Sequence, residues 1–392
     1  MIGILGSGQL AKMISEAAQG MGIPVTVLAA SQSDPAVHSA AESQIGSWEN
    51  PSDLTRFIAG KDRVLFENEF VPEKAFRTAG IASDDPLFEP RLSILYRLQD
   101  KWQQKLILNE LQIPTSDAQL IRGQDLQALQ DLDHRYGKGG WVLKWCRLGY
   151  DGKGTFLKSL DHSAALKFLE AADTRGVSIY AEAKVAFVRE LAMVYARNHD
   201  GDFLHFPLVI SEQRDGICFE VKGPASAFGV SLDLEKRAAD YGRRLGDRLG
   251  LTGVYAIEFF EAPAVSDLKS TRDARGLWVN EIAPRVHNSG HYSQDACSFS
   301  QFQAHLAMAL SQWKGERVLA PQAKPFFGML NLIGETSGKS QAPKLPKDSK
   351  LILHWYQKTE IRPGRKMGHL NYFADSIEEF EKLAKSARDV KL

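Results

Sequence analysis

Residues 279–291 bring an acid, two amides, a guanidinium, two imidazoles and a hydroxyl together, in the order Val-Asn-Glu-Ile-Ala-Pro-Arg-Val-His-Asn-Ser-Gly-His. The first part of this stretch is typical of a buried strand and the remainder of a loop. Polar groups that are buried without partners cost a few kcal/mol each. Because Glu281 lies on the apolar strand itself, the stretch favours the floor of an active site over an ordinary polar loop.

Glu258 interrupts a second apolar run, 253–260, which we expect to pair with 277–283 as a hairpin across the polar connection 262–276. Cross-strand neighbours lie about 5 Å apart on one face of a sheet, so the carboxylates of Glu258 and Glu281 would repel each other and raise a pKa. A divalent cation would remove this repulsion. Oxygen ligands without histidine or cysteine indicate Mg²⁺ or Mn²⁺, with phosphate oxygens completing the shell. Two separate salt bridges are the alternative.

A lysine and a glycine-rich loop precede these acids in the chain. Lys144 ends the apolar run 141–144, and residues 149–155 follow as Gly-Tyr-Asp-Gly-Lys-Gly-Thr. Such a backbone is mobile, and its amides can close on phosphates. The loop lacks the spacing of a Walker motif, and taken alone it could be a β-hairpin turn. Together with Lys144 and the downstream acids, it favours a metal-dependent site for nucleotide phosphates.

The N-terminus contains a candidate anion site. A strand is predicted at 2–5, a turn at Gly6-Ser7-Gly8, a helix at 10–21 and a strand at 24–28, which together make a parallel α/β unit. A dinucleotide fold would place an acid about 20 residues after the glycines, and the residues after the second strand offer none. We therefore interpret the turn as a phosphate or close backbone-approach site at a helix N-terminus. A packing turn that binds nothing is the alternative.

Polar side chains also follow the predicted strand 63–66. Ligands bind outside the carboxyl ends of strands in an open α/β sheet, so Asn68 and Glu69 are candidates to face the same ligand as Gly8. Glu67 or Glu69 could equally cap the next helix, and the sequence does not decide between these two interpretations.

A cationic turn lies near the other end of the chain. Residues 362–369 read Arg-Pro-Gly-Arg-Lys-Met-Gly-His, and Lys358 precedes them. This pattern indicates a clamp for a phosphorylated or otherwise anionic substrate, with a solvated surface as the alternative. A nucleotide site combined with separate clamps at Gly8-Gln9 and at Lys358 and Arg365 favours a ligase that activates a carboxylate as an acyl phosphate.

Further elements must position these groups. A helix over 91–111 would make Arg97 and Lys101 i,i+4 neighbours on one face. The remaining predictions are strands at 177–182, 190–196 and 325–333, a polar turn at 213–216, helices at 231–250 and 300–310, and a small α+β piece over the last 60 residues or so.

Composition bounds the class of protein. A chain of 392 residues is long enough for two or three domains. The formal net charge of zero gives no indication of a nucleic-acid or anionic-membrane partner. Cys146, Cys218 and Cys297 are widely spaced and odd in number, which fits a reducing compartment. The N-terminus resembles neither a signal peptide nor a membrane span, so we expect a cytoplasmic protein.

Over essentially its whole length the chain resembles the ATP-grasp superfamily and, within it, the N5-carboxyaminoimidazole ribonucleotide synthetases of purine synthesis. The matching motifs are Gly6-Ser-Gly-Gln-Leu10, Arg97-Leu-Gln-Asp-Lys101, Gly149-Tyr-Asp-Gly-Lys-Gly154, Arg189-Glu-Leu191, Arg214-Asp-Gly-Ile217, Asn280-Glu-Ile-Ala-Pro-Arg285, His287-Asn-Ser-Gly-His291 and Arg362-Pro-Gly-Arg-Lys-Met-Gly-His369. The last three together are highly specific to this family.

The resemblance implies a protein of mixed α/β and α+β class. A Rossmann-like parallel sheet, the pre-ATP-grasp domain, would occupy 1–95. An ATP-grasp domain would occupy 96–310, with a mobile glycine-loop lid over about 115–182. A small C-terminal α+β domain at 311–392 would contribute to the substrate site. The resemblance also implies a homodimer.

It further implies an ATP-dependent carboxylation. ATP phosphorylates bicarbonate to carboxyphosphate, and the exocyclic amine of aminoimidazole ribonucleotide takes the carboxyl group. The ATP site would comprise Arg97, Lys144, Gly149, Tyr150, Gly152, Lys153, Gly154, Thr155, Glu182, Ala183, Lys184, Val185, Glu190, Gln213, Asn280 and Glu281. Mg²⁺, or Mn²⁺ in its place, would be held by Glu258 and Glu281.

Aminoimidazole ribonucleotide and bicarbonate would be held by Gly8, Gln9, Leu10, Tyr150, Asp151, Arg285, His287, Lys358 and Arg365. Of these, the resemblance implies catalytic roles for Asp151, Lys358 and Arg285. Asp151 would handle the proton of the substrate amine, and its position in the closing loop would make catalysis depend on closure.

The chain departs from the family pattern at Ala11-Lys12, which replaces Gly-Arg, and at 66–72, 145–148 and 262–276. These departures leave open an ATP-grasp ligase with a different acceptor. Two rivals from other classes are a nicotinamide-dependent oxidoreductase that reads Gly6-x-Gly8 and a nucleotide-binding module without catalysis. The missing acid argues against the first, and Glu258 with Glu281 argues against the second, because binding an adenine needs no metal pair.

Overall fold

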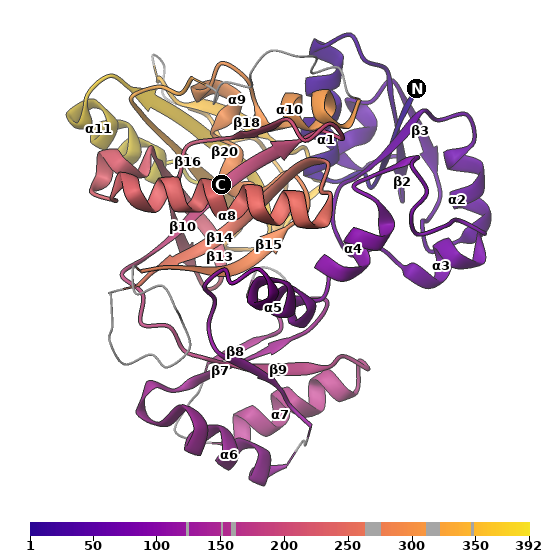
Figure 1. The fold of residues 1–392 in the computed structure, drawn as a ribbon. Coiled ribbons are helices and arrows are strands. Elements are labelled where there is room, and N and C mark those ends of the chain that lie inside the picture. The colour runs from indigo at the N-terminus through magenta and orange to yellow at the C-terminus, as the bar shows by residue number, and fades with distance from the viewer. Residues whose placement is uncertain (123–124, 150–151, 158–161, 263–275, 311–321, 346–348) are drawn as a thin grey trace.

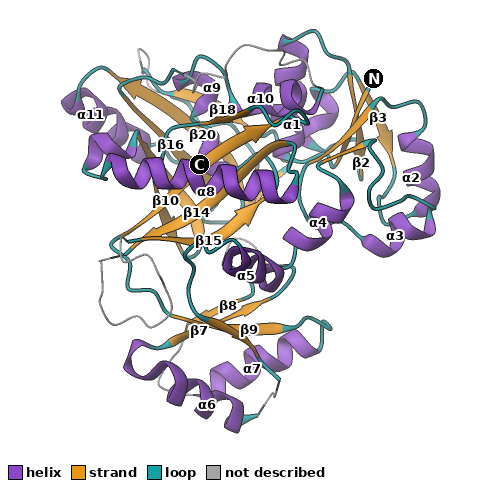
Figure 2. Cartoon of the chain, in the orientation of Figure 1, coloured by secondary structure: helices purple, strands orange, loops and turns teal. Residues whose placement is uncertain are grey.

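The computed structural model describes residues 1–122, 125–149, 152–157, 162–262, 276–310, 322–345 and 349–392. The N-terminal part lies to one side of a large central sheet, and a smaller lobe lies below that sheet in the view of Figure 1. Figure 2 separates the strands from the helices that cover them. Tyr150, Asp151 and most of the connection 262–276 lie outside the described residues.

The N-terminal part is an open parallel sheet in the strand order β3-β2-β1-β4-β5. Its strands are β1 (Ile2–Leu5), β2 (Val25–Ala29), β3 (Glu42–Ile45), β4 (Arg63–Phe66) and β5 (Phe88–Glu89), and its helices are α1 (Gln9–Gly20), α2 (Pro51–Ile58) and α3 (Glu73–Thr78). The predicted strands 2–5 and 63–66 are confirmed, and the one predicted at 24–28 begins one residue later. β1 and β2 are buried throughout, as expected for strands covered on both faces.

The helix predicted over 91–111 is wrong, because the segment forms two helices, α4 (Leu92–Leu98) and α5 (Lys101–Glu110). Asp100 separates them, and its carboxylate accepts hydrogen bonds from the backbone amides of Trp102 (3.0 Å) and Gln103 (3.2 Å). An aspartate that caps a new helix competes with continuation of the old one. Arg97 and Lys101 therefore lie on different helices and are not neighbours on one helical face.

The lobe below the central sheet, here called the lid, contains a four-stranded antiparallel sheet in the order β6-β9-β7-β8. Its strands are β6 (Ala118–Leu120), β7 (Trp141–Trp145), β8 (Thr155–Leu157) and β9 (Ile179–Ala183), and its helices are α6 (Leu126–Tyr136) and α7 (His162–Asp173). Leu129, Leu132 and Leu169 of these helices pack on Trp141 and Leu143 of the sheet. The lid thus has an apolar core of its own.

The central sheet runs in the order β15-β14-β10-β12-β13-β16-β20-β18, with β11 beside β10, and its pairings are antiparallel. Its strands are β10 (Arg189–Arg197), β11 (Phe203–His205), β12 (Val209–Arg214), β13 (Ile217–Gly223), β14 (Gly253–Glu261), β15 (Leu277–Ala283), β16 (Phe326–Ile333), β18 (Ile352–Trp355) and β20 (Lys366–Ala374). The C-terminal strands thus extend the same sheet as the strands of the carboxylate pair. A separate two-stranded ribbon joins β17 (Gly338–Lys339) to β19 (Glu360–Ile361).

Helices cover both faces of the central sheet. These are α8 (Leu232–Leu249), α9 (Ser293–Ala296), α10 (Gln301–Ala309) and α11 (Ile377–Arg388). Tyr195 and Tyr255 lie in one apolar cluster with residues of α8 and α5, whereas Val194 and Ala256 belong to the cluster that contains α10 and α1. The expected hairpin of β14 and β15 is confirmed. The polar turn expected at 213–216 is shorter, because β12 continues through Arg214.

None of the described helices is long and apolar enough to cross a membrane.

Candidate active site

Glu258 and Glu281 are direct cross-strand partners in the β14–β15 hairpin. Strand side chains alternate, so Glu190, Ala192 and Val194 of β10 share a face, and the pairing of Ala192 with Glu258 puts Glu258 on that face too. Ala192 and Val194 are packed under α10. Beyond them the same face becomes acidic, which makes a charged floor at the end of an apolar sheet.

A β-bulge adds an amide to this floor. The register shifts after Glu258, so that Glu258 pairs with Glu281 and Phe259 pairs with Val279, which leaves Asn280 as the extra residue. The Asn280 side chain donates to Glu258 Oε2 at 3.5 Å and accepts from Lys144 Nζ at 3.0 Å. The bulge therefore lets Asn280 and Glu281, which are adjacent in the chain, serve the same site as Glu258.

The neighbouring acids add to the cost of ionising Glu258. Burial, followed by the charges of Glu281 and Glu190, raises the pKa of Glu258 to about 7. Burial also raises the pKa of Glu190 to about 7, against the influence of Lys144. Within the described residues, no cluster of three or more histidines, cysteines or acids is arranged to hold a metal ion. The chemistry of the pair still fits a hard divalent cation, because two crowded carboxylates and an amide oxygen are its usual ligands.

Lys101, not Arg97, reaches the acids. Lys101 is the first residue of α5, and its ammonium lies 2.6 Å from Glu281 Oε2. Arg97 is exposed on α4, on the other side of the helix break. The sequence contained a signal for Lys101, because it follows Asp100, a strong N-cap residue. A cation on Glu281 is what a crowded carboxylate pair needs when no metal neutralises it.

Lys144 is buried beside the same floor and pairs with Glu182. Its ammonium lies 2.6 Å from Glu182 Oε1. The other carboxylate oxygen of Glu182 lies 2.7 Å from Lys105 Nζ and accepts from Ser116 at 2.6 Å. Although burial opposes ionisation, the two lysines hold the pKa of Glu182 well below its usual range. Sequence reasoning missed Lys105, whose spacing of four from Lys101 on one helix was the available signal.

The connector 182–185 is held by a few backbone hydrogen bonds and one apolar contact. The backbone amide of Ala183 donates to Asp117 O at 2.8 Å and that of Lys184 donates to Gly140 O at 3.1 Å. Val185 is buried near Trp278. Gln213 lies within β12, and its side chain donates to Ser211 Oγ at 2.9 Å.

The glycine loop is the connection between β7 and β8, in which Lys144 pairs with Thr155. The hairpin geometry and a phosphate-binding role are compatible, because the loop leaves directly from the lysine strand. Gly152 has φ of +75°, and a Cβ there would lie 2.8 Å from the carbonyl oxygen of Asp215 in the β12–β13 turn. Gly154 packs against the ring of Trp145. The described part of the loop thus lies against the central sheet, with Lys153 exposed.

The turn at the start of α1 already holds an anion from the chain itself. The backbone amide of Gly8 donates to Glu67 Oε2 at 2.7 Å, and the amides of Leu10 and Ala11 also favour the charged carboxylate. Burial nevertheless raises the pKa of Glu67. A Cβ at Gly8 would lie 2.2 Å from Glu67 Oε1. The close approach predicted for this turn is therefore made by Glu67, with Gln9 beside it.

Arg285 is held by Glu69 across the domain junction. Its guanidinium forms an ion pair with both oxygens of Glu69, with Nη2 at 3.2 Å from Oε1, and Nη1 donates to Val286 O at 3.1 Å. Although burial opposes it, this guanidinium lowers the pKa of Glu69. Neither Glu67 nor Glu69 caps α3, since Pro72 occupies the N-cap position without a side-chain bond, Glu67 accepts from Gly8 N and Glu69 pairs with Arg285. Of the two interpretations of this segment, the cap is wrong.

His287 lies between Glu258 on one side and the cations Arg285 and Lys366 on the other. Burial and then the charges of Arg285 and Lys366 lower its pKa to about 3, so the imidazole is neutral. Its Nε2 lies 3.5 Å from Glu258 Oε1. The buried amide side chain of Gln301 accepts from His287 N at 2.9 Å and donates to His287 O at 2.8 Å. The loop after β15 is therefore fixed at both backbone groups of the histidine.

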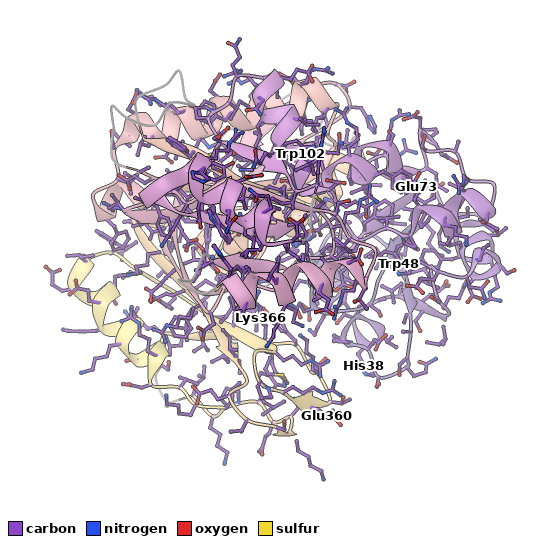
Figure 3. All side chains as sticks on the ribbon, turned by 90° about the horizontal axis from the view of Figure 1, so that it is seen from below. His38, Trp48, Glu73, Trp102, Glu360 and Lys366 are labelled. Carbon is purple, nitrogen blue, oxygen red and sulfur yellow. The ribbon has the colours of Figure 1, made fainter. Side chains whose placement is uncertain are left out.

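Lys358 and Arg365 both bond to backbone carbonyl groups of the C-terminal segment. Lys358 donates to Lys366 O at 2.7 Å, and its charge acts on Glu67. Arg365 donates to Glu360 O at 3.0 Å, at the exposed edge of the turn. Lys366, which sequence reasoning did not single out as a site residue, acts electrostatically on His287. In the view from below, Figure 3 labels Lys366 at the start of β20 and Trp102 on α5.

Three family models match the chain in succession. The ribonucleotide synthetase pre-ATP-grasp domain matches residues 1–89, the ATP-grasp domain 106–302 and the phosphoribosylaminoimidazole carboxylase C-terminal domain 328–383.

Curated relatives match along nearly all of the chain. The N5-carboxyaminoimidazole ribonucleotide synthase of a Synechocystis species is 37% identical over 96% of this chain and 92% of its own. The protein of that name from Corynebacterium ammoniagenes is 31% identical over 99% and 91%.

Solved structures agree in fold. The N5-carboxyaminoimidazole ribonucleotide synthetase of Thermus thermophilus has a TM-score of 0.81 at 30% identity, covering 100% of this chain and 98% of its own. The N5-carboxyaminoimidazole synthase of Aspergillus clavatus, in complex with ADP and 5-aminoimidazole ribonucleotide, has a TM-score of 0.83 at 28% identity, covering 99% and 97%.

Proposed function

The chain belongs to the N5-carboxyaminoimidazole ribonucleotide synthase family and is an ATP-dependent ligase that carboxylates aminoimidazole ribonucleotide in purine biosynthesis, and we propose that it does so through carboxyphosphate on the floor built by β14 and β15. The observation that carries this assignment of the site is the register pair of Glu258 and Glu281, with Asn280 on the bulge and Lys144 opposite. This arrangement joins the acids of the central sheet to Lys144 of the lid sheet.

The ATP side comprises Lys144, Lys101, Glu258, Glu281 and Asn280. Lys144 and Lys101 neutralise phosphate charge, which is the larger part of catalysis in phosphoryl transfer. Glu258 and Glu281, with the Asn280 oxygen, would hold Mg²⁺ or Mn²⁺. Such an ion supplies charge neutralisation on the phosphates and orients them. The raised pKa of Glu258 supports this assignment, because it marks a site that favours an added cation.

The nucleoside end of ATP is assigned to the connector 182–185 and to Glu190. Glu190 opens β10 on the acidic face, where its carboxylate can accept from ribose hydroxyls. Gln213 lies on the neighbouring strand β12, two residues before Asp215, whose carbonyl oxygen lies against Gly152 of the glycine loop. Arg97 has the weakest support of the residues assigned to ATP, because it is exposed on α4 while Lys101 contacts Glu281.

The acceptor side comprises Arg285, His287, Lys358 and Lys366, with Arg365 at its rim. Arg285, held by Glu69, would present its guanidinium to bicarbonate or to the carboxyphosphate formed from it. The neutral His287 can accept or donate one hydrogen bond without adding a charge. Lys358 and Lys366 supply positive charge for a substrate phosphate.

The turn at Gly8-Gln9-Leu10 faces the same acceptor through Glu67. Glu67 already binds the backbone amides at the start of α1. A substrate phosphate could bind these amides only by displacing the Glu67 carboxylate. We assign the half-buried residues Gly8 and Gln9 of this turn to the sugar of the acceptor, whose hydroxyls can donate to Glu67.

Asp151 and Tyr150 belong to the glycine loop and lie outside the described residues. We propose that Asp151 takes the proton of the substrate amine as the carboxyl group is transferred. The support is its place in a loop that leaves directly from the Lys144 strand. We further propose a cytoplasmic homodimer, on the strength of the family resemblance.

The test of the function is phosphate release from ATP with each substrate omitted in turn. Release should require bicarbonate and rise when aminoimidazole ribonucleotide is added. Other amines, such as a glycinamide ribonucleotide, should not replace it. Phosphate release that another amine stimulates as strongly would assign a different acceptor to the same site. Sedimentation of the protein tests the dimer, and a monomer at micromolar concentration would refute it.

The site assignment is tested separately by Glu281→Gln and by its control, Glu261→Gln. Glu261 lies on the neighbouring strand and pairs with Arg189 instead of facing the floor. The first change should reduce turnover at least 100-fold, because one metal-binding carboxylate is lost. The control should retain turnover within about threefold. Equal activity of both variants would remove Glu281 from the metal site.

A further inference from the structure

We propose that Lys105 is a positioning residue for nucleotide binding, which fixes Glu182 and through it aims Lys144 at the phosphates. This inference rests on the proposed function of the site. It concerns a lysine to which sequence motifs give no role. Lys105 lies on α5, and its residue surface is 2% exposed.

The Lys105 ammonium has three close acceptors. It donates to Thr115 Oγ1 and to Ser116 Oγ, each at 2.7 Å, and lies 2.7 Å from Glu182 Oε2. An ammonium has three protons, so these partners account for all of its hydrogen-bonding capacity. Burial lowers the pKa of Lys105, and the charge of Glu182 opposes that effect. A buried charge that is fully bonded in this way is held in one geometry.

These partners belong to both chain segments that connect the lid to the rest of the protein. Thr115 and Ser116 lie just before β6, and Glu182 lies at the end of β9. Thr115 Oγ1 also donates to Val279 O of β15 at 2.8 Å, and Glu182 pairs with Ala118 across the lid sheet. Lys105 thus ties the entry and the exit of the lid to one point.

The helix that carries Lys105 is itself fixed to the central sheet. Gln104 donates to Ile282 O at 2.9 Å and accepts from Ile282 N at 2.9 Å, while it also donates to Leu98 O at 2.6 Å. Lys101, one turn earlier on α5, contacts Glu281. The same helix therefore sets the position of a carboxylate in the metal pair and of a carboxylate in the lid.

Glu182 passes this position on to Lys144. One oxygen of Glu182 contacts Lys105 and Ser116, and the other lies 2.6 Å from Lys144 Nζ. Lys144 is then shared with Asn280 at 3.0 Å. Without Lys105, the Glu182 carboxylate would lose one of its two lysine partners and would attract Lys144 more strongly. The ammonium would be drawn toward Glu182, away from Asn280 and the phosphates.

The experiment compares Lys105→Met, Lys105→Arg, Glu182→Gln and the double variant Lys105→Met/Glu182→Gln in the full chain. Lys350→Met is the matched control, because Lys350 is exposed and pairs with Glu379 far from the lid. ADP binding with Mg²⁺ is measured by titration calorimetry without acceptor. The KM values for ATP and for aminoimidazole ribonucleotide are measured alongside, and thermal midpoints report folding.

Lys105→Met should weaken ADP binding and raise the KM for ATP about tenfold or more, with the KM for aminoimidazole ribonucleotide within twofold. Lys105→Arg keeps the charge and should stay within about threefold of the parent. Lys350→Met should match the parent. If Lys105 acts through Glu182, adding Lys105→Met to Glu182→Gln should change ADP binding by less than threefold. The double variant leaves no unpaired buried carboxylate, so it reports the coupling even where Lys105→Met folds poorly.

Two results would overturn the inference. One is ADP binding by Lys105→Met equal to that of the parent. The other is a Lys105→Met penalty that persists in full on Glu182→Gln, which would mean that Lys105 does not act through Glu182. Both results are read from ADP binding with Mg²⁺, without acceptor. A wrong acceptor for the enzyme would change the phosphate-release assay and leave these binding results intact.

Discussion

Replacing Glu258 with glutamine should stabilise the nucleotide-free protein at pH 8 while it abolishes activity. Glu258 is half-buried beside Glu281 and Glu190, and its pKa is raised from 4.5 to about 7. Because the folded pKa exceeds the unfolded one, the folded protein binds an extra proton between about pH 4.5 and 7, and stability falls as pH rises through that window. Above pH 7 the ionised carboxylate is a cost that glutamine avoids.

The magnitude follows from the pKa. The rise from 4.5 to about 7 corresponds to about 3 kcal/mol, at about 1.4 kcal/mol per pKa unit. The Glu258 side chain is 30% exposed, and solvent screening reduces the expected gain to roughly 1 to 2 kcal/mol. At pH 4 the Glu258 carboxyl is protonated in the folded protein and largely protonated in the unfolded chain, so the gain from glutamine should almost vanish.

The assay is calorimetric unfolding of the parent and of Glu258→Gln at pH 8 and pH 4, without ligand and with MgADP. The variant should unfold at a higher temperature than the parent at pH 8 and at nearly the same temperature at pH 4. MgADP should stabilise the parent strongly and the variant little. Glu261→Gln, which breaks the ion pair with Arg189, should not stabilise at either pH. A variant less stable than the parent at pH 8, or a gain that persists undiminished at pH 4, would refute the account of Glu258 as a destabilising buried charge.

Three further predictions concern single residues. Asp151→Asn should fold and bind ATP yet lose carboxylation, and wild-type turnover would remove Asp151 from the mechanism. Glu69→Gln removes the charged partner of Arg285 and should raise the KM for bicarbonate or aminoimidazole ribonucleotide severalfold with the KM for ATP unchanged, as steady-state kinetics would reveal. Gly6→Ala should destabilise the protein by about 1–3 kcal/mol, because φ is +117° and a Cβ would lie 2.6 Å from Glu67 Cβ; an unchanged unfolding midpoint would contradict this.

The sequence by itself was sufficient for the acidic floor. Strand alternation and apolar flanks predicted the hairpin of β14 and β15, and the pairing of Glu258 with Glu281 followed from it. Lys144 at the end of its strand and the glycine loop after it were equally local patterns. Such predictions succeed because strand direction and face depend on neighbours within a few residues.

One local feature was misread. Asp100 divides the helix expected over 91–111, and its capping bonds determine that Lys101, not Arg97, reaches Glu281. The sequence contains Asp100 and Lys101, but the competition between capping and helix continuation depends on how α4 and α5 pack. Propensity alone does not decide such a competition.

The remaining site contacts depend on the tertiary structure alone. Glu69 meets Arg285, Glu67 occupies the start of α1, and Lys105 joins both connections of the lid through Glu182. Each of these contacts unites segments far apart in the chain. The physical reason is that a buried charge is stable only with its partner, and no periodicity along the sequence states which distant segment will supply that partner. The sequence determined which groups could do the chemistry, and the docking of the N-terminal sheet, the lid and the central sheet decided which of them meet.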